Sequence, residues 1–195
     1  MKIIGITGGV GAGKSEILSY ISKNYSCRVI RADEAAHLLE EPGQHCYEQL
    51  VELLGTKILN HDLTINKKAM ADVIFKDKAI LEKVNAIIHP EVKKYIIEQI
   101  ELEKEKNNVK YFFIEAALLI EEKYDQIADE LWYIHSDVAI REKRLAKTRH
   151  YSAAKTADIM RGQLSEEEFR KHCAVVISNN GDLEETYKQI KTFLD

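Results

Sequence analysis

The chain has 195 residues, of which 45% are hydrophobic and 31% charged, and its formal net charge is −4 at pH 7. This length suits one compact domain, and the apolar fraction excludes an intrinsically disordered chain. The negative charge argues against a general nucleic-acid-binding protein, which would carry a basic surface. The longest apolar stretches are too short to cross a bilayer. We therefore expect neither a nucleic-acid partner nor a membrane partner.

The first half of the chain alternates apolar runs with amphipathic stretches, which is typical of parallel βαβ units. Residues 2–7 form a short β-branched run that predicts a buried strand, and residues 15–24 have apolar side chains at helical spacing. A second strand is expected at 28–31, followed by a helix from Glu34. This opening resembles a strand rather than a signal peptide, so we expect a cytoplasmic protein.

The segment 43–106 is predicted to be largely helical. Its apolar helix 79–88 is expected to end at His89-Pro90, because proline lacks the N–H that an interior helical position donates. The charged run that closes the segment (ELEKEKNN) predicts a solvated helix end and a turn.

The second half of the chain predicts three more strands, at 110–114, 130–135 and 174–178. Residues 137–172 are predicted to be helical, with a capping box at Ser165 and Glu168. The last helix has a second capping box at Asp182 and Glu185. Its buried stripe is expected to consist of Leu183, Tyr187, Ile190 and Leu194.

These elements predict one α/β domain spanning residues 1–195, with a roughly five-stranded parallel sheet in three layers. Two helical segments interrupt the alternation, at about 43–106 and at about 137–172. The cysteines Cys27, Cys46 and Cys173 are an odd set without CxxC spacing, which predicts free thiols rather than disulfides or a zinc site.

Glycines are scarce except near the N-terminus, where the sequence GGVGAGKS at residues 8–15 matches GxxxxGK[ST] at every fixed position. Such a loop turns backbone N–H groups inward around phosphate oxygens, and the following helix presents its positive end. Lys14 is expected to reach the β- and γ-phosphates and the Ser15 hydroxyl to ligate magnesium. The loop lies between a predicted strand and a predicted helix, which favours nucleoside-triphosphate binding over a chance glycine-rich turn.

The rest of the sequence narrows the type of nucleotide-binding protein. A switch GTPase needs NKxD and DxxG segments, but this chain has NKKA at 66–69 and no aspartate three residues before any glycine. Residues 141–155 carry six basic side chains against one acidic side chain. Arg141 and Arg144 share a helical face there, which suits a lid that closes over the γ-phosphate. The alternative is a solvated basic helix.

Two carboxylates follow predicted strands, where ligands bind in an open α/β sheet. Asp33 could accept the proton of an attacking hydroxyl, or it could cap the helix 34–39. Glu115 could hold a magnesium-bound water, or it could be a partly buried acid at a strand end. His89 alone is typical of a packed or capping histidine.

Together these segments resemble the dephospho-CoA kinase family, which completes coenzyme A synthesis. The resemblance covers nearly the whole chain in the right order, through GITGGVGAGKS, RADEAAH, DVIFKDKAILEKVNAIIHPEV, EAALLIE, REKRL and VISNNG. The His-Pro segment followed by a Leu-Leu-x-Glu segment is more specific than the phosphate loop. The chain departs from the family pattern at four places. Glu16 stands where the family usually has threonine, and Asn66-Lys67 stands where it commonly has Asp-Arg. Glu115 and Ala117 replace an aspartate and a proline, and Thr148 stands where an arginine is often found.

The resemblance implies a P-loop kinase fold in which 43–106 binds the substrate and 137–172 is the lid. It implies transfer of the ATP γ-phosphoryl group to the ribose 3′-hydroxyl of dephospho-CoA, with Mg²⁺ as cofactor. Its implied catalytic residues are Lys14, Asp33 and Arg144. The ATP-binding residues would be Gly9, Gly11, Ala12, Gly13, Lys14, Ser15, Glu16, Arg141 and Asn179. The residues that would bind dephospho-CoA are Thr7, Asp33, Lys67, Asn85, His89 and Leu118. Magnesium would be held by Ser15, with Glu115 acting through a water.

Two other functions fit the same loop: a P-loop kinase for a nucleoside monophosphate or a metabolite alcohol, and an ATP-binding module without an acceptor. No long heptad repeat occurs in the sequence, and we expect a monomer or a weak homo-oligomer.

Overall fold

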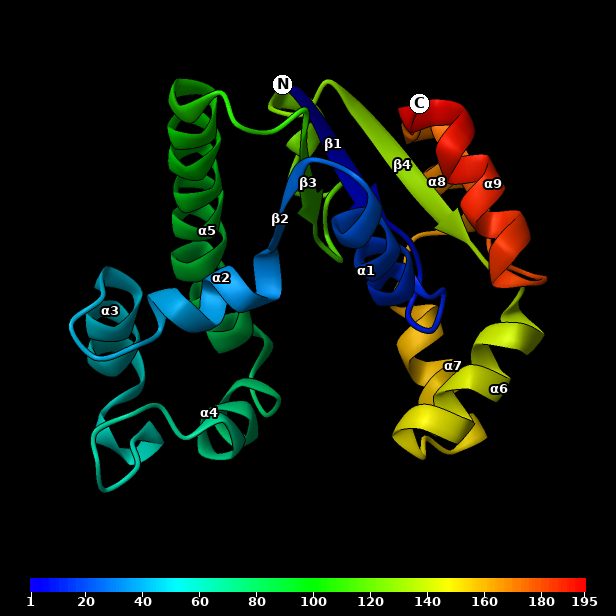
Figure 1. Ribbon diagram of the computed structural model, residues 1–195. Coiled ribbons are helices and arrows are strands. Elements are labelled where there is room, and N and C mark those ends of the chain that lie inside the picture. The colour runs from blue at the N-terminus through cyan, green and yellow to red at the C-terminus, as the bar shows by residue number, and fades with distance from the viewer. The chain divides into compact units, whose positions relative to one another are not determined.

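The computed structural model describes residues 1–195, and they form two compact units. The first unit comprises Met1–Val29 and Glu103–Asp195, and the second comprises Ile30–Leu102. Figure 1 shows the course of the chain through both units.

A five-stranded sheet in the order β2-β3-β1-β4-β5 organises the first unit. The strands are β1 (Lys2–Thr7), β2 (Cys27–Arg31), β3 (Tyr111–Glu115), β4 (Glu130–His135) and β5 (Val175–Ser178). Central β1 pairs in parallel with β3 and β4, and β4 pairs in parallel with β5. The predicted parallel sheet is therefore confirmed, with every strand boundary within one residue of its predicted place. Because the strands are parallel, their carboxyl ends share one edge of the sheet.

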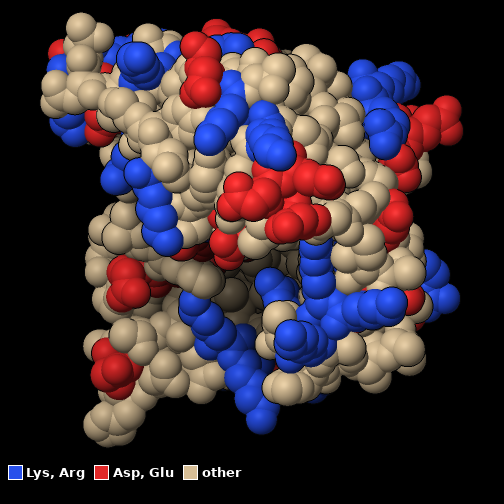
Figure 2. All heavy atoms as spheres, turned by 45° about the vertical axis from the view of Figure 1, so that its right-hand side comes forward, with Lys and Arg blue, Asp and Glu red and all other residues tan.

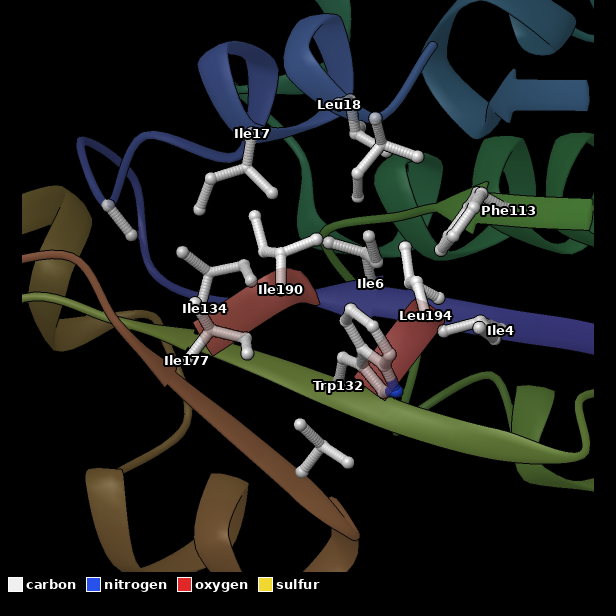
Figure 3. Packing of buried hydrophobic residues seen from close by; sticks show 13 residues of the cluster. Ile4, Ile6, Ile17, Leu18, Phe113, Trp132, Ile134, Ile177, Ile190 and Leu194 are labelled. Carbon is white, nitrogen blue, oxygen red and sulfur yellow. The ribbon is translucent and has the colours of Figure 1, made fainter. Parts of the chain in front are cut away.

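Helices cover both faces of this sheet. The helices of the first unit are α1 (Lys14–Asn24), α6 (Val138–Arg149), α7 (Ala153–Arg161), α8 (Glu166–His172) and α9 (Leu183–Leu194), with the short 3-10 helix η2 (Tyr124–Gln126). Figure 3 shows Ile17 of α1 and Ile190 of α9 packed together against Ile6 and Trp132 of the sheet. On the other face, the Phe169 ring of α8 stacks on a tyrosine of β4. The three predicted layers are present.

The predicted N-caps Ser165 and Asp182 are confirmed, but Asp182 accepts from the N–H of Glu184 and not from that of Glu185, its partner in the predicted capping box. The Ser165 hydroxyl accepts from the Glu168 N–H at 3.2 Å, and the Asp182 carboxylate accepts from a first-turn N–H of α9. Ile190 and Leu194 are buried as expected, but the next position of that stripe is Thr186, which is 1% exposed. A polar side chain thus occupies the buried face of α9 near its start.

The second unit is helical and has its own core. Its helices are α2 (Ala32–Leu39), α3 (His45–Leu54), the 3-10 helix η1 (Thr56–Ile58), α4 (Lys67–Ile74) and most of α5 (Lys78–Lys106). Leu50, Ile58 and Val84 pack together in this core. The predicted helical character of 43–106 is confirmed.

Helix α5 continues through Pro90, so the prediction that helix 79–88 ends at His89-Pro90 is wrong. Val84 lies before the proline, and Val92 and Ile96 lie after it. These three side chains are buried, and they are spaced by eight and four residues along the helix. The helix therefore presents one continuous apolar stripe. Burial of this stripe outweighs the single hydrogen bond that proline removes, because each buried aliphatic side chain contributes about 1.5–3 kcal/mol.

Helix α2 begins at Ala32, two residues before its predicted start, and its N-cap is Arg31. Strand β2 therefore leads directly into the helix. Asp33 and Glu34 lie within the first turn, where carboxylates interact favourably with the positive end of the helix. Asp33 does not cap the helix, and that alternative is excluded.

All three cysteines are free thiols, as predicted. Burial raises the pKa of Cys46 to about 11 and that of Cys173 to about 12, and it also raises the pKa of Cys27. Because the thiolate is the reactive form, we expect a disulfide reagent at pH 8 to label the native protein slowly and the unfolded protein at once. Half-buried Cys27 should react first; rapid labelling of native Cys46 or Cys173 would contradict this expectation.

No helix of the structure combines the length and the apolar character that a membrane span requires.

Candidate functional site

The phosphate loop links β1 to α1 through a backbone conformation that depends on glycine. Gly13 is the N-cap of α1 and has a left-handed φ of 92°. The Gly13 carbonyl accepts from the N–H groups of Glu16 and Ile17, both at 3.2 Å, which fixes the loop to the first turn. The loop therefore meets the positive end of α1, where backbone N–H groups are available to an anion.

Gly13 also lies too close to its neighbours for any side chain. A Cβ atom there would lie 2.3 Å from the Asn179 Nδ2 atom. We expect Gly13→Ala to weaken ATP binding by about tenfold or more, because the loop must move away from Asn179 and give up its left-handed φ. Titration of ATP into both proteins measures this effect. The matched control is Gly55→Ala, whose φ is 77° but whose Cβ meets nothing within 4 Å; equal losses of ATP affinity in the two variants would contradict the expectation.

Lys14 and Glu115 lie together at the carboxyl edge of the sheet. The Lys14 Nζ atom donates to the Gly8 carbonyl at 2.7 Å and lies 3.9 Å from the Glu115 Oε1 atom. Glu115 ends β3, whose register places it opposite Ile6 of β1. Both charged side chains are less than one-fifth exposed. The start of α1 and the end of β3 thus bring a cation and a carboxylate together beside the phosphate loop.

Thr7 ends β1 immediately before the loop and is fully buried. Its hydroxyl has no hydrogen-bond partner within the protein. An unsatisfied buried hydroxyl costs about 1–3 kcal/mol, so it is an unusual feature of a native structure. A polar group of a bound ligand or a water at this edge would satisfy it.

Arg141 of α6 holds the first part of the phosphate loop. Its Nε atom donates to the Val10 carbonyl at 2.8 Å, and an Nη atom donates to the Gln163 Oε1 atom at 2.6 Å. A Cβ at Gly9 would lie 2.4 Å from the Arg141 Cζ atom, so a larger residue at this position would force the guanidinium to move. Burial lowers the pKa of Arg141 from its ordinary value. The guanidinium nevertheless keeps its charge, because arginine is not deprotonated in proteins.

Gln163 matches the family pattern, but it is not among the residues predicted to bind ATP or dephospho-CoA. Its Oε1 atom also accepts from the Val10 N–H at 3.2 Å, so one amide oxygen connects α6 to the loop. Gln163 follows the C-cap glycine of α7. The resemblance gave this position no role, and a single glutamine after a helix does not indicate one by its chemistry alone.

Arg144 holds the second part of the loop together with Asn179. The Arg144 guanidinium donates to the Ser136 hydroxyl at 2.9 Å, to the Asn179 carbonyl at 2.9 Å and to the Ala12 carbonyl at 3.4 Å. The Asn179 side-chain amide donates to the Ala12 carbonyl at 2.8 Å. The structure therefore brings together Lys14, Arg141, Arg144 and Asn179 around the loop. Ser136, like Gln163, was not predicted.

Basic side chains are concentrated along this part of the chain, as the count for 141–155 indicated. Figure 2 shows lysine and arginine side chains in both halves of one face of the protein, several of them in the lower half of the view. Lys155, one of the six basic side chains counted for 141–155, lies over the Tyr151 ring at 3.9 Å from its centroid. A positive surface of this kind favours a polyphosphate ligand.

Three further predicted residues belong to the first unit: two lie at the start of α1, and one follows β3. Ser15 is in the first turn of α1 and is exposed. Glu16, next to it, accepts a hydrogen bond from the Tyr187 hydroxyl at 3.3 Å. Leu118 follows β3 and is 42% exposed. Their contacts with a ligand stay predictions.

The other predicted residues belong to the second unit. Asp33 is exposed in the first turn of α2, and Lys67 is exposed at the start of α4, where the Asn66 side chain caps the helix. Asn85 and His89 are half-buried on α5. The roles of these four residues stay predictions.

The oxygen donors of the loop fit a magnesium ion. Mg²⁺ keeps several waters and takes substrate phosphate oxygens together with one or two protein oxygens. Ser15 supplies a hydroxyl at the start of α1, and Glu115 supplies a carboxylate beside Lys14. The structure contains no group of three or more His, Cys, Asp or Glu side chains that could hold a metal ion.

Comparison with known proteins agrees with this site. A family model described as dephospho-CoA kinase matches residues 2–185. A dephospho-CoA kinase of Fusobacterium nucleatum is 32% identical over 195 residues, which cover 100% of this chain and 98% of that protein. One of Listeria monocytogenes is 33% identical over 194 residues, covering 100% of this chain and 96% of the relative.

Solved structures show the same fold. TT1252 from Thermus thermophilus has a TM-score of 0.82 at 27% identity, covering 99% of this chain and 96% of its own. Dephospho-CoA kinase from Campylobacter jejuni has a TM-score of 0.72 at 22% identity, and the match covers 100% of this chain and 98% of that protein. The family model and the full-length relatives decide the assignment: the chain belongs to the dephospho-CoA kinase family.

Proposed function

We propose that this protein transfers the γ-phosphoryl group of ATP to the ribose 3′-hydroxyl of dephospho-CoA and releases CoA and ADP. Family membership over residues 2–185 carries the choice of acceptor. The phosphate loop, with Lys14, Arg141 and Arg144 directed at it, supports ATP as the donor. The enzyme would act on small molecules as a cytoplasmic monomer or weak homo-oligomer.

Phosphoryl transfer depends mainly on positioning and on stabilisation of charge. The 3′-oxygen would attack the γ-phosphorus while the bond to the β-bridging oxygen breaks, and ADP would leave with that electron pair. Lys14, held at the Gly8 carbonyl, would bind the β- and γ-phosphate oxygens. Arg144 would exchange its contact with the Ala12 carbonyl, the longest of its contacts at 3.4 Å, for a γ-phosphate oxygen.

Magnesium, when bound, would neutralise charge on the β- and γ-phosphates, and Ser15 and Glu115 would hold it, the latter through a water. Asp33 would accept the proton of the attacking 3′-hydroxyl, and its exposed carboxylate in the first turn of α2 is open to a substrate. The buried Thr7 hydroxyl would donate to a bound substrate oxygen at the carboxyl edge of β1.

The remaining contacts with dephospho-CoA would come from Lys67, Asn85, His89 and Leu118. Lys67 would pair with a phosphate, and the exposed Leu118 side chain would pack on an apolar part of the substrate. Asn85 and His89 lie four residues apart on α5, so they face the same side of that helix.

A comparison of acceptors tests the proposal. Magnesium-ATP is supplied with dephospho-CoA, with nucleoside monophosphates, or with CoA, and ADP release is followed. CoA is the matched control, because it is dephospho-CoA with the 3′-hydroxyl already phosphorylated. We expect ADP release only with dephospho-CoA. Equal turnover with a nucleoside monophosphate would favour a different small-molecule kinase, and no release with any acceptor would favour an ATP-binding module.

A further inference from the structure

A buried group of polar side chains lies behind the second half of the phosphate loop. Asn179, Ser136 and Thr186 are 1%, 3% and 1% exposed, although each carries a polar side chain. They come from the ends of β5 and β4 and from the first turns of α9. Arg144 of α6 completes the group through its bonds to the Ser136 hydroxyl and the Asn179 carbonyl. Four separate elements are thus joined directly behind Ala12.

The partners of Asn179 fix the orientation of its side-chain amide. One end faces the Ala12 carbonyl at 2.8 Å, and a carbonyl only accepts, so this end is the NH₂ group. The other end, Oδ1, lies 3.2 Å from the Thr186 hydroxyl, whose single proton also has the Ser178 carbonyl at 3.2 Å and the Asp182 carbonyl at 3.4 Å as acceptors. The backbone of Asn179 is fixed as well, because its N–H donates to the His135 carbonyl at 2.8 Å and its carbonyl accepts from Ser136 at 2.7 Å.

The bond to Ala12 determines where the next N–H group points. In a trans peptide, the carbonyl of one residue and the N–H of the following residue point in opposite directions. The structure has no cis peptide bond. When Asn179 holds the Ala12 carbonyl on its own side, the Gly13 N–H is directed to the opposite side, which is the inside of the loop.

The same arrangement occurs two residues earlier in the loop. Arg141 holds the Val10 carbonyl at 2.8 Å, so the following N–H, that of Gly11, also points away from α6. Gln163 accepts from the Val10 N–H at 3.2 Å. The Val10–Gly11 and Ala12–Gly13 peptide groups are therefore both held from outside through their carbonyls, which orients their own N–H groups, those of Gly11 and Gly13, in advance of ligand binding.

We propose that Asn179 is a positioning residue for the phosphate loop, which turns the Gly13 N–H toward the bound phosphates. Donation from the Thr186 hydroxyl to Asn179 Oδ1 supports the amide orientation that this role requires. Asn179 then acts on the nucleotide through its phosphates rather than through its base. The inference rests on the proposed function for its ligand, ATP, and does not depend on the identity of the acceptor.

Binding of two diphosphates tests this role. Dissociation constants for ADP and GDP are measured by calorimetry for the wild type, Asn179→Ala, Thr186→Val and Thr186→Ser. The two ligands share the diphosphate and differ in the base. Thr186→Val removes the hydroxyl at nearly constant volume, and Thr186→Ser restores it. Thermal unfolding of each variant records any general loss of stability.

We expect Asn179→Ala to raise the dissociation constants of ADP and GDP by the same factor, about tenfold or more, because the Ala12 carbonyl loses its main hydrogen-bond donor. Thr186→Val should raise both dissociation constants by a smaller common factor. The dissociation constants of Thr186→Ser should lie within about twofold of those of the wild type. If Asn179→Ala fails to fold, the dissociation constants of the two Thr186 variants alone test the positioning role of Asn179.

Loss of ADP affinity alone in Asn179→Ala would assign Asn179 to the base and overturn the proposal. Equal affinities for Thr186→Val and the wild type would also overturn it, as would a lower unfolding temperature without any change in affinity. A wild type that binds ADP but phosphorylates no dephospho-CoA would refute the proposed acceptor and leave this test intact. A wild type that binds neither diphosphate would overturn both proposals.

Discussion

Lys14→Ala is expected to lower kcat by on the order of a hundredfold or more, because it removes the cation that stabilises charge on the transferring phosphoryl group. KM for ATP should rise as well, since the same ammonium binds the phosphates of the ground state. In the structure this ammonium donates to the Gly8 carbonyl and lies 3.9 Å from Glu115. Its removal therefore also takes away one cation that lies beside that carboxylate. Steady-state kinetics with varied ATP measures both effects.

A matched control comes from the other end of the same helix. Lys23 lies in the last turn of α1 and is exposed. Lys23→Ala removes one positive charge from the same helix and is expected to keep wild-type kinetics. Equal activity losses in the two variants would attribute the effect of Lys14→Ala to the general charge of α1, and wild-type turnover by Lys14→Ala would refute its catalytic role.

Asp33→Asn is the second variant with a large expected effect, a fall in kcat of on the order of a hundredfold or more. An amide of the same shape cannot accept the proton of the attacking hydroxyl. The side chain is exposed and does not cap α2, so the substitution should leave the unfolding temperature nearly unchanged. KM for dephospho-CoA should change much less than kcat if the carboxylate acts mainly in the transition state.

Glu34 provides the comparison for Asp33. It is the next residue of the same helical turn, and its exposed carboxylate pairs with Arg31 at 2.9 Å. Glu34→Gln removes the same charge one position away and should retain wild-type turnover. Wild-type turnover by Asp33→Asn would refute its assignment as the base; a comparable loss in both variants would point to the charge of this turn instead.

The strands and the phosphate loop could be predicted because their signals are local. Residues 2–7 form a short apolar run, and the loop that follows matches a fixed pattern of glycine, lysine and serine. The errors occurred where packing outweighs a local rule. Pro90 lies inside α5, since the apolar stripe of that helix continues on both sides of it. Strand β2 leads directly into α2, and no residue between them signalled that the helix begins at Ala32.

The contacts that shape the loop could not be derived from sequence spacing. Arg141 and Val10 are 131 residues apart in the chain, and Asn179 and Ala12 are 167 residues apart. The charge count favoured a basic lid but gave no partner for any of its arginines. Thr186 did carry a signal, because it lies four residues before Ile190 on the buried face of α9, where a polar side chain needs a partner.

The position of the new phosphate tests the central claim most directly. Wild-type protein is incubated with magnesium-ATP and dephospho-CoA, and the product is examined by ³¹P nuclear magnetic resonance coupled to protons. We predict one ADP for each acceptor consumed and a new phosphomonoester resonance coupled to the ribose 3′ proton. A phosphate at any other position, or ADP release that does not depend on dephospho-CoA, would contradict the assignment of this chain as a dephospho-CoA 3′-kinase.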